Sequence, residues 1–327
     1  MGAFAGRLGT RFLVVTVVPN ALLLGYISFL LAAGAPAHSP SLARALAALD
    51  HLTANRIAAV ILGLLIVSIA SHPLQVPLIQ LLEGYWWGLP FGLKLAYRAT
   101  ARYRNEWNLV QSELEAAKDP APWDWHARNA GRSAQFRWDW LPEVEGDLLP
   151  TALGNTLRRG ETRAGERYQL DLTVALPRLT PLMAPGVLAE LSDLRNQLDA
   201  AARLCIAAGI ATAVSVGLLI WHGPWLFLAL ATYLVTWACY RSAVAAARRF
   251  CISLTAAVDL CHLQLFDALS LERPADLVEE RERNERLSRL FRGQLANDEM
   301  AAFRYVLPPR TDNPTAEGGT TTPPGQQ

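Results

Sequence analysis

The sequence predicts a mainly α integral membrane protein, with four transmembrane helices in two hairpins and a small cytosolic insert that is α or α+β. The first observation behind this prediction is the composition, because 52% of the 327 residues are hydrophobic and the mean hydropathy is +0.18. The second is that only 18% of the residues are charged, whereas about one-quarter is usual in soluble domains. The third is that the apolar residues form runs of about 20, the length that a helix needs to cross the hydrocarbon core.

Composition and motifs also exclude several classes of function. The net charge of +1 gives no reason to expect a nucleic-acid partner. The four cysteines form no CxxC or Cys/His spacing, so we expect no metal site and no cofactor. No HExxH, GxSxG, Walker or GxGxxG pattern occurs in a usable context. We therefore predict no catalytic residue and favour a function other than catalysis.

The first two apolar runs are Phe12 to Leu31 and Ile57 to Leu82. Pro73 lies inside the second run, where it predicts a kink. The flanks of the first run also resemble those of a signal peptide. A signal peptide has an apolar region of only about 7–15 residues, so we interpret the longer run as a retained span and keep the signal peptide as the alternative.

The last two runs are Leu204 to Ile220 and Trp225 to Ala247, joined by a tight turn at His222-Gly223-Pro224. Gly209, Ala213 and Gly217 follow at four-residue spacing in the third run. Small residues at this spacing let helices approach closely, and they predict helix packing within or between subunits.

Arginine and lysine set the predicted orientation, because they gather on the cytosolic side of membrane proteins. They precede the first span and follow the second and the fourth, whereas the loop from 36 to 55 carries one arginine and the turn between the last two spans carries none. We therefore expect a multi-pass protein of the cell membrane with both termini in the cytosol. The predicted parts are a transmembrane hairpin (1–90), a cytosolic insert (91–203), a second transmembrane hairpin (204–247), cytosolic C-terminal helices (248–300) and a disordered tail (301–327).

The insert is predicted to begin with a helix from Gly92 to Ala117, which carries Lys94, Arg98 and Arg102 at four-residue steps. A basic face beside the inner leaflet attracts anionic lipid. The alternative is that these residues only fix the topology.

Two similar tripeptides, Trp123-Asp124-Trp125 and Trp138-Asp139-Trp140, flank the segment Asn129 to Arg132. Alternation on both sides of an Asn/Gly segment predicts a β-hairpin, with Asp124 opposite Arg137 across the strands. The alternation from Tyr168 to Leu176 predicts a third strand over its aromatic face. This face is interpreted as a small core or a membrane contact, and the alternative is a platform for a ligand.

A helix is predicted to begin at Pro150, which suits a first turn. It would place Thr151, Asn155 and Arg158 on one face, with Arg159 beside them. Such a helix start, converging with Arg98 or Arg102, is the one candidate ligand site, and its ligand would be an anion or a lipid headgroup. The alternative is that Asn155 and Thr151 bond the local backbone.

Beyond the fourth span, a helix is predicted from Arg249 to Leu271. A second, solvated helix is predicted over Glu279 to Arg292, with Glu282 and Arg286 as an i,i+4 ion pair.

The run Leu149 to Arg158 (LPTALGNTLR), with Glu166 to Asp171, Pro177 to Leu179 and Leu81 to Trp86, resembles a pattern in hypothetical multi-pass membrane proteins of actinobacteria. Gln169 stands where that pattern has glycine, and Ala152 where arginine is commoner. The resemblance implies a multi-pass membrane fold. It implies no activity and no functional residue, because that family has none assigned.

Three classes of function remain. The first is a membrane-anchored scaffold or regulator whose cytosolic part binds a partner protein, and it fits the absence of catalytic motifs. The second is a homo-oligomeric ion channel, suggested by the layout of two hairpins with cytosolic helices. The third is an anionic-lipid-handling protein that uses the basic residues named above. The expected partners are the lipid bilayer and either further copies of the chain or a cytosolic protein.

Overall fold

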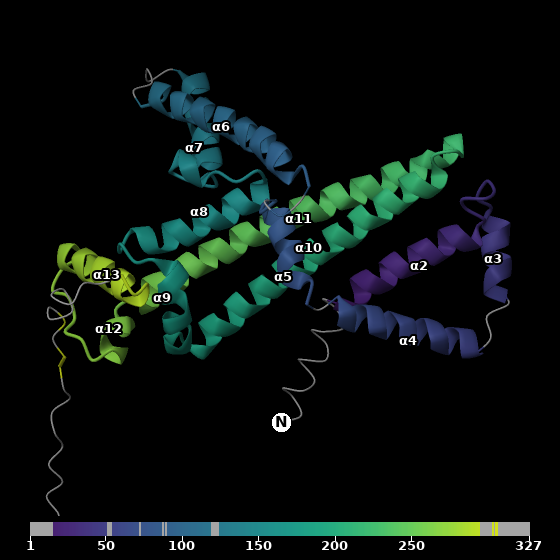
Figure 1. Ribbon diagram of the computed structural model, residues 1–327. Helices are drawn as coiled ribbons and strands as arrows, with labels where there is room; N and C mark the ends of the chain where they lie inside the picture. The colour runs from purple at the N-terminus through teal and green to yellow at the C-terminus, as the bar shows by residue number, and fades with distance from the viewer. Residues whose placement is uncertain are drawn as a thin grey trace, which may run out of the picture. The chain divides into compact units, whose positions relative to one another are not determined.

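The computed structural model describes residues 16–50, 54–71, 73–86, 88, 90–118, 124–294, 303 and 305–306 (Figure 1). Within these residues the chain forms twelve α-helices, α2 to α13, with short 3₁₀ helices between some of them. The described part contains no strand, only an isolated antiparallel bridge between Leu271 and Tyr305. The prediction of a mainly α protein is confirmed. The start of the predicted first span and most of the predicted tail lie outside the described residues.

The chain divides into two compact units. The larger comprises Met1–Arg167 and Met183–Asp259, and the smaller comprises Tyr168–Leu182 and Leu260–Gln327. Each unit is described by itself below. The predicted five-part division follows the expected membrane boundary, and it stays a prediction.

Two long helices, α10 (Pro185–Leu219) and α11 (Phe227–Cys261), dominate the larger unit. They are joined by a 3₁₀ turn, η4 (Gly223–Leu226), at the predicted tight turn. The hydroxyls of Thr212 and Thr236 lie 3.2 Å apart, and Ser253 donates to Glu190 at 3.4 Å. The later residue of α10 (Thr212) thus contacts the earlier residue of α11 (Thr236), and the earlier residue of α10 (Glu190) contacts the later one of α11 (Ser253). The two helices are therefore antiparallel. Each has 35 residues and is therefore about 52 Å long.

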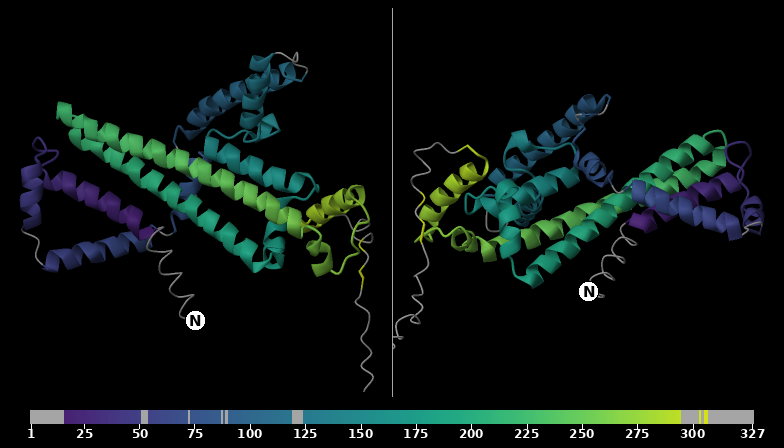
Figure 2. Two further views of the ribbon diagram at one scale, coloured as in Figure 1. Left: turned by 180° about the vertical axis from the view of Figure 1, so that it is seen from behind. Right: turned by 60° about the horizontal axis from the view of Figure 1, so that its bottom comes forward.

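Of the three N-terminal helices of this unit, the first lies beside α10 and the other two contact the first (Figure 2). They are α2 (Val18–Ala32), α3 (Leu42–Asp50) and α4 (Ala54–Ala70). Arg203 of α10 donates to Thr16, just before α2, and the hydroxyls of Tyr26 and Ser215 are 2.7 Å apart. These two contacts make α2 parallel to α10.

Helix α4 is antiparallel to α2. The side chain of Asn20, near the start of α2, donates to Ser68 at 3.3 Å and to Ser71 at 3.0 Å, at the end of α4. The helical path then breaks at Ser71 and resumes as α5 (Gln75–Glu83). This break falls at Pro73, where the sequence predicts a kink.

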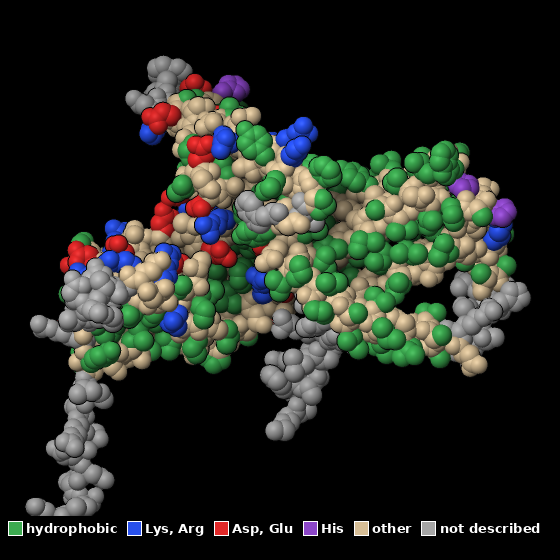
Figure 3. Space-filling view, in the orientation of Figure 1, with side chains coloured by type: hydrophobic (Ala, Val, Ile, Leu, Met, Phe, Trp, Pro, Cys, Tyr) green, Lys and Arg blue, Asp and Glu red, His purple; other side chains and the backbone are tan. Residues whose placement is uncertain are grey.

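One helix in the described part of the chain, α10, is by itself long and apolar enough to cross a membrane. Val18–Ala32 and Ala58–Ala70 form shorter apolar helices. In the larger unit, hydrophobic side chains cover most of the visible face of α2, α4 and the η4 ends of α10 and α11, whereas charged side chains gather over α6, α7 and α8 (Figure 3). Several large apolar side chains on α4 and α11 are more than half exposed, among them Val60, Ile61, Leu62, Ile66, Leu230, Leu234 and Trp237.

The predicted β-hairpin is wrong. Its residues form α7 (Trp125–Trp138), which packs against α6 (Gly92–Ala116); Trp123 lies outside the described residues. Asp124 caps α7 by accepting from Ala127 N at 2.9 Å, and Arg137 pairs with Glu113 of α6. The predicted cross-strand pair of Asp124 and Arg137 therefore does not form.

Gly131 shows why the hairpin prediction failed. A Cβ added to this glycine would lie 2.6 Å from the Cβ of Ala117, so the residue permits a close contact beside α6. The sequence alone does not distinguish a glycine that permits close packing from a glycine that a turn requires. The helix α6 itself ends within one residue of its predicted end.

Helix α8 (Ala152–Glu166) lies against α5 and α11 in the larger unit. A Cβ on Gly160 would lie 2.1 Å from Sγ of Cys251, which fixes a close approach of α8 to α11. Burial raises the pKa of the Cys251 thiol to about 12, so this thiol stays protonated and packs as an apolar group. The core at this contact consists of Leu153, Leu157, Leu198, Ala243, Val244, Ala247 and Cys251.

The smaller unit contains α9 (Leu172–Leu179), α12 (Gln264–Ala268) and α13 (Leu277–Phe291). The predicted third strand from Tyr168 to Leu176 is therefore wrong, because Asp171 caps α9 by accepting from Thr173 N at 2.9 Å. The helix predicted from Arg249 to Leu271 is interrupted after Cys261 and resumes as α12. The predicted pair of Glu282 and Arg286 is present at 3.7 Å on α13.

Candidate functional site

The predicted ligand site begins at the N-terminus of α8, where Thr151 is the N-cap. Its hydroxyl accepts from Gly154 N at 3.0 Å and donates to the carbonyl of Glu83, at the end of α5, at 2.8 Å. The backbone N–H of Leu153, also in the first turn of α8, donates to the Tyr240 hydroxyl of α11 at 3.2 Å. These N–H groups, which would hold an anion at an open helix start, are instead bonded within the protein.

Asn155 is almost completely buried. Its side-chain oxygen accepts from Leu149 N at 2.7 Å, and its side-chain nitrogen donates to Leu149 O at 3.0 Å. Both ends of the amide are therefore used to close the loop that precedes α8. This bonding to the local backbone is the alternative considered for Asn155, and it counts against a role for this residue in binding an anion.

The two arginines of the predicted site have carboxylate partners. Arg158 pairs with Asp147 at 2.9 Å, and this hydrogen bond raises the pKa of Arg158. Arg159 is nearly buried and lies between Glu143 at 2.6 Å and Glu166 at 3.3 Å. A hydrogen bond between the two glutamates lowers the pKa of Glu143 and raises that of Glu166.

The remaining two residues of the predicted site, Arg98 and Arg102, are exposed on α6. Neither has an ion pair within the part of the chain that the structure describes. The predicted convergence of these two with Arg158 and Arg159 stays a prediction. What the structure does bring together at the start of α8 is a junction of three helices, held by Thr151, Glu83 and Tyr240.

The smaller unit holds a buried polar cluster that sequence reasoning missed. The Nδ1 atom of His262 lies 2.5 Å from Oε1 of Glu280, and the His262 ring stacks on Tyr168 at 3.9 Å between centroids. Asn284, one turn after Glu280, donates to the backbone oxygen of Tyr168 at 3.0 Å. The cluster joins α13 to the residues before α9 and after α11. His262 and Glu280 are 18 residues apart, so no local spacing in the sequence could have revealed it.

A groove of about 290 Å³ lies at the surface of the smaller unit. Phe266, Leu271 and Phe303 supply its apolar part. The charged part of its lining consists of Glu272, Glu279, Glu282, Arg283 and Arg286.

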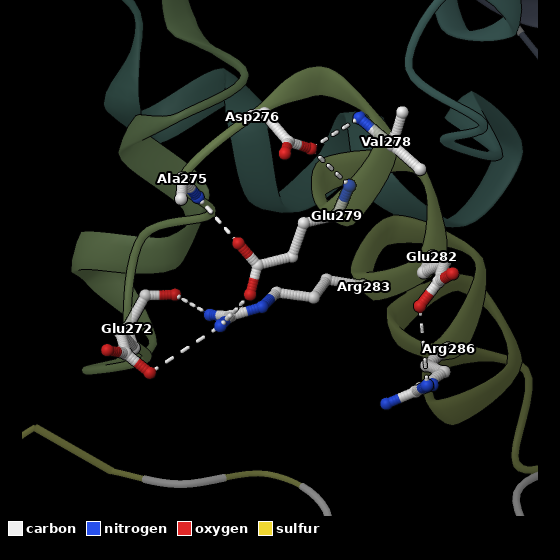
Figure 4. Close-up of polar contacts among 8 residues, drawn as sticks. All are labelled: Glu272, Ala275, Asp276, Val278, Glu279, Glu282, Arg283 and Arg286. Carbon is white, nitrogen blue, oxygen red and sulfur yellow. Dashed lines mark hydrogen bonds and ion pairs between the residues drawn. The ribbon is translucent and has the colours of Figure 1, made fainter.

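The charges around this groove are paired with one another (Figure 4). Arg283 contacts Glu279 at 2.5 Å and Glu272 at 3.5 Å, and Glu282 contacts Arg286 at 3.7 Å. The volume is at the lower limit of small-molecule pockets. Such a groove suits one large apolar side chain of a partner better than a cofactor.

A second cavity, of about 150 Å³, lies between α2, α10 and α11 in the larger unit. Its lining is almost wholly apolar and includes Leu22, Ala208 and Val235. Within the described residues, no group of three or more His, Cys, Asp and Glu side chains is placed to hold a metal ion.

No family model matches this chain, and searches of curated proteins and of solved structures found no similar protein.

Proposed function

We propose that this chain is a four-span protein of the cell membrane, and that its cytosolic helices form a scaffold that binds a partner protein. The membrane part of the proposal rests on the direction of the four apolar segments. Helix α2 is parallel to α10, α4 is antiparallel to α2, and α11 is antiparallel to α10. Successive spans must alternate in direction, and these four segments do.

The distribution of charge supports the same placement. The sequence has no Asp, Glu, Lys or Arg from Leu204 to Tyr240 or from Ile57 to Leu82. The first charged residues beyond these stretches, on the side away from η4, are Glu83, Arg203 and Arg241. Arginine at this level, together with the basic face of α6, supports a cytosolic location for that side, because arginine and lysine gather on the cytosolic side of membrane proteins.

Cysteine labelling tests the topology with a matched pair of variants. Ser39 and Ser112 are both exposed serines, before α3 and on α6. In a chain that also carries Cys239→Ala, we expect Ser39→Cys to react with a membrane-impermeant maleimide on intact cells. Ser112→Cys should react only after the membrane is permeabilised. Labelling of Ser112→Cys on intact cells would reverse the orientation, and protection of both positions would contradict the four-span arrangement.

The groove in the smaller unit carries the partner-binding part of the proposal. Its apolar part, Phe266, Leu271 and Phe303, lies next to charges that already satisfy one another. A partner is therefore favoured when it inserts an apolar side chain and leaves these ion pairs intact, because a buried unpaired charge is costly. We expect the partner to be a protein segment with one large apolar anchor.

Photo-cross-linking in the native membrane tests this part. A photoreactive residue in place of Glu282, at the groove, should yield an adduct, whereas one in place of Arg281 should not, because adjacent helical residues point in different directions. An adduct formed equally from position 281 would exclude the groove. An adduct with a second copy of the chain would instead favour a homo-oligomer, such as the predicted channel.

A further inference from the structure

Two arginines of α11, Arg241 and Arg248, lie just beyond the charge-free stretch that ends at Tyr240. They are seven residues apart, which is about two helical turns, so both lie on the same face of α11. In the proposed topology this is the level of the inner headgroups. Sequence reasoning treated these arginines only as topology signals.

Arg248 is held by aromatic rings. Its guanidinium carbon lies 5.0 Å from the ring centre of Trp140 and 5.4 Å from that of Phe136, at the end of α7. Such cation–π contacts orient a guanidinium without neutralising it. The Nε atom of Arg248 is buried and has no hydrogen-bond partner in the described structure.

Arg248 also has no carboxylate partner among the described residues, in contrast to Arg158, Arg159 and Arg163 of the neighbouring α8, which are all paired. Burial, followed by the charge of Arg241, lowers the pKa of Arg248. Arg241 begins about 10 Å along the axis of α11 from Arg248, on the same face, and its charge adds to the local positive potential. Arg241 is exposed, with its guanidinium carbon 5.9 Å from the ring centre of Trp237.

We propose that Arg241 and Arg248 together bind the phosphate group of an anionic phospholipid of the inner leaflet. Arginine suits this role because its planar guanidinium donates two parallel hydrogen bonds to phosphate oxygens. Trp237 and Trp140 add the aromatic rings that favour the headgroup level. The apolar surface of α11 from Phe227 to Trp237 would carry the acyl chains, and this location selects a lipid phosphate over a free one.

The test uses the full chain in nanodiscs of phosphatidylcholine, with or without phosphatidylglycerol, and measures the midpoint of thermal unfolding. A ligand that binds only the folded state raises this midpoint. We expect phosphatidylglycerol to raise it for the unchanged protein. Arg248→Gln and Arg241→Gln should each lose most of the rise, with an apparent affinity for phosphatidylglycerol about tenfold weaker.

Arg249→Gln is the matched control. Arg249 is the next residue along α11, it is exposed, and its replacement changes the net charge by the same amount. It should keep the rise in midpoint. Arg248→Lys keeps the charge but loses the planar group, so it should keep part of the rise.

Three results would overturn the proposal. An equal loss in Arg249→Gln would show general attraction to a charged bilayer. An equal rise with inorganic phosphate, for protein in neutral detergent micelles, would show a site for free anions. No rise with phosphatidylglycerol in the unchanged protein would show that there is no site. If Arg248→Gln does not elute as a single folded species, the proposal is tested with Arg241→Gln, because Arg241 is exposed and its replacement leaves the core unchanged.

Discussion

The hydroxyl of Tyr240 on α11 accepts a hydrogen bond from the backbone N–H of Leu153, in the first turn of α8, at 3.2 Å. One side chain of a long apolar helix thus completes the cap of a helix that lies more than eighty residues earlier in the chain. Leu153 is fully buried, so water cannot replace this acceptor. The run LPTALGN therefore has a structural role, because it docks the start of α8 against α5 and α11.

Removing this acceptor should destabilise the larger unit. We expect Tyr240→Phe to lower the free energy of unfolding by about 1–3 kcal/mol, the cost of a buried donor left without a partner. Tyr233→Phe on the same helix, where the side chain is 55% exposed, should have little effect. Urea or thermal unfolding of the purified protein in detergent measures both. Equal effects of the two variants would show that the hydrogen bond contributes nothing.

A methyl group at Gly154 should force α8 away from α5. A Cβ there would lie 2.0 Å from the backbone oxygen of Glu83, and backbone atoms cannot rotate out of the way. We expect Gly154→Ala to cost about 1–3 kcal/mol or more. Gly186→Ala, in the first turn of α10 with open space around it, should be neutral or slightly stabilising. Unfolding midpoints of both variants test this difference.

Trp138 of α7 packs against Trp107 of α6, with 5.7 Å between ring centres. Both lie next to the buried core of Val110, Ala134, Leu141 and Leu148. We expect Trp138→Ala to cost about 3 kcal/mol, as large-to-small changes at packed sites do. Trp125→Ala, at a position 63% exposed on the same helix, should change stability by about 0.5 kcal/mol or less. A similar loss in both variants would contradict the packing of α7 on α6.

Asp171 makes the smaller unit sensitive to acid. Burial alone would raise the pKa of this carboxyl, but hydrogen bonds from Thr173 and Arg292 outweigh burial and lower it. Its contribution to stability is therefore present above the unfolded pKa of about 3.9 and is lost as the pH falls through the lower, folded pKa.

Asp171→Asn keeps a capping side chain and removes the charge, so it isolates this effect. We expect it to be less stable than the unchanged protein by about 1 kcal/mol at neutral pH. The difference between the two should shrink below about pH 4 as Asp171 is protonated. Unfolding midpoints of both proteins, measured across this pH range, give the difference directly. A difference that stays constant with pH would show that the charge of Asp171 has no role.

The apolar helices were the part of the fold that the sequence predicted best. Each apolar residue adds to the same signal in a long run, so α2, α10 and α11 overlap most of three predicted apolar runs. Their ends were not predicted, because α10 begins 19 residues before its run, at Pro185, and α11 continues 14 residues past its run, to Cys261. The tryptophan-rich segment was mispredicted because its alternation is short and its aromatic residues also fit a helix. Ala134 and Trp138 are four residues apart on α7, and both face α6. That this segment is a helix is visible only in the folded chain, where Gly131 packs against Ala117 at the end of α6.

The sites were harder to predict than the fold, for a physical reason. Asn155 carries a polar side chain that can serve a ligand or the backbone, and the partner is decided by the position of Leu149. Arg248 meets Phe136 and Trp140 across more than a hundred residues of intervening sequence. A guanidinium without a carboxylate partner is a property of the folded chain, and no spacing in the sequence signals it.

The continuity of α10 has a mechanical consequence. This helix has no break between its start at Pro185 and its end at Leu219, and with the bilayer placed as proposed about 28 Å of it extends beyond Arg203 into the cytosol. Apolar spans tilt when the thickness of the surrounding bilayer changes. A tilt of about 10° would displace the Pro185 end of α10 sideways by about 5 Å. A change in lipid thickness would thus reach the cytosolic helices as a displacement, without any hinge inside α10.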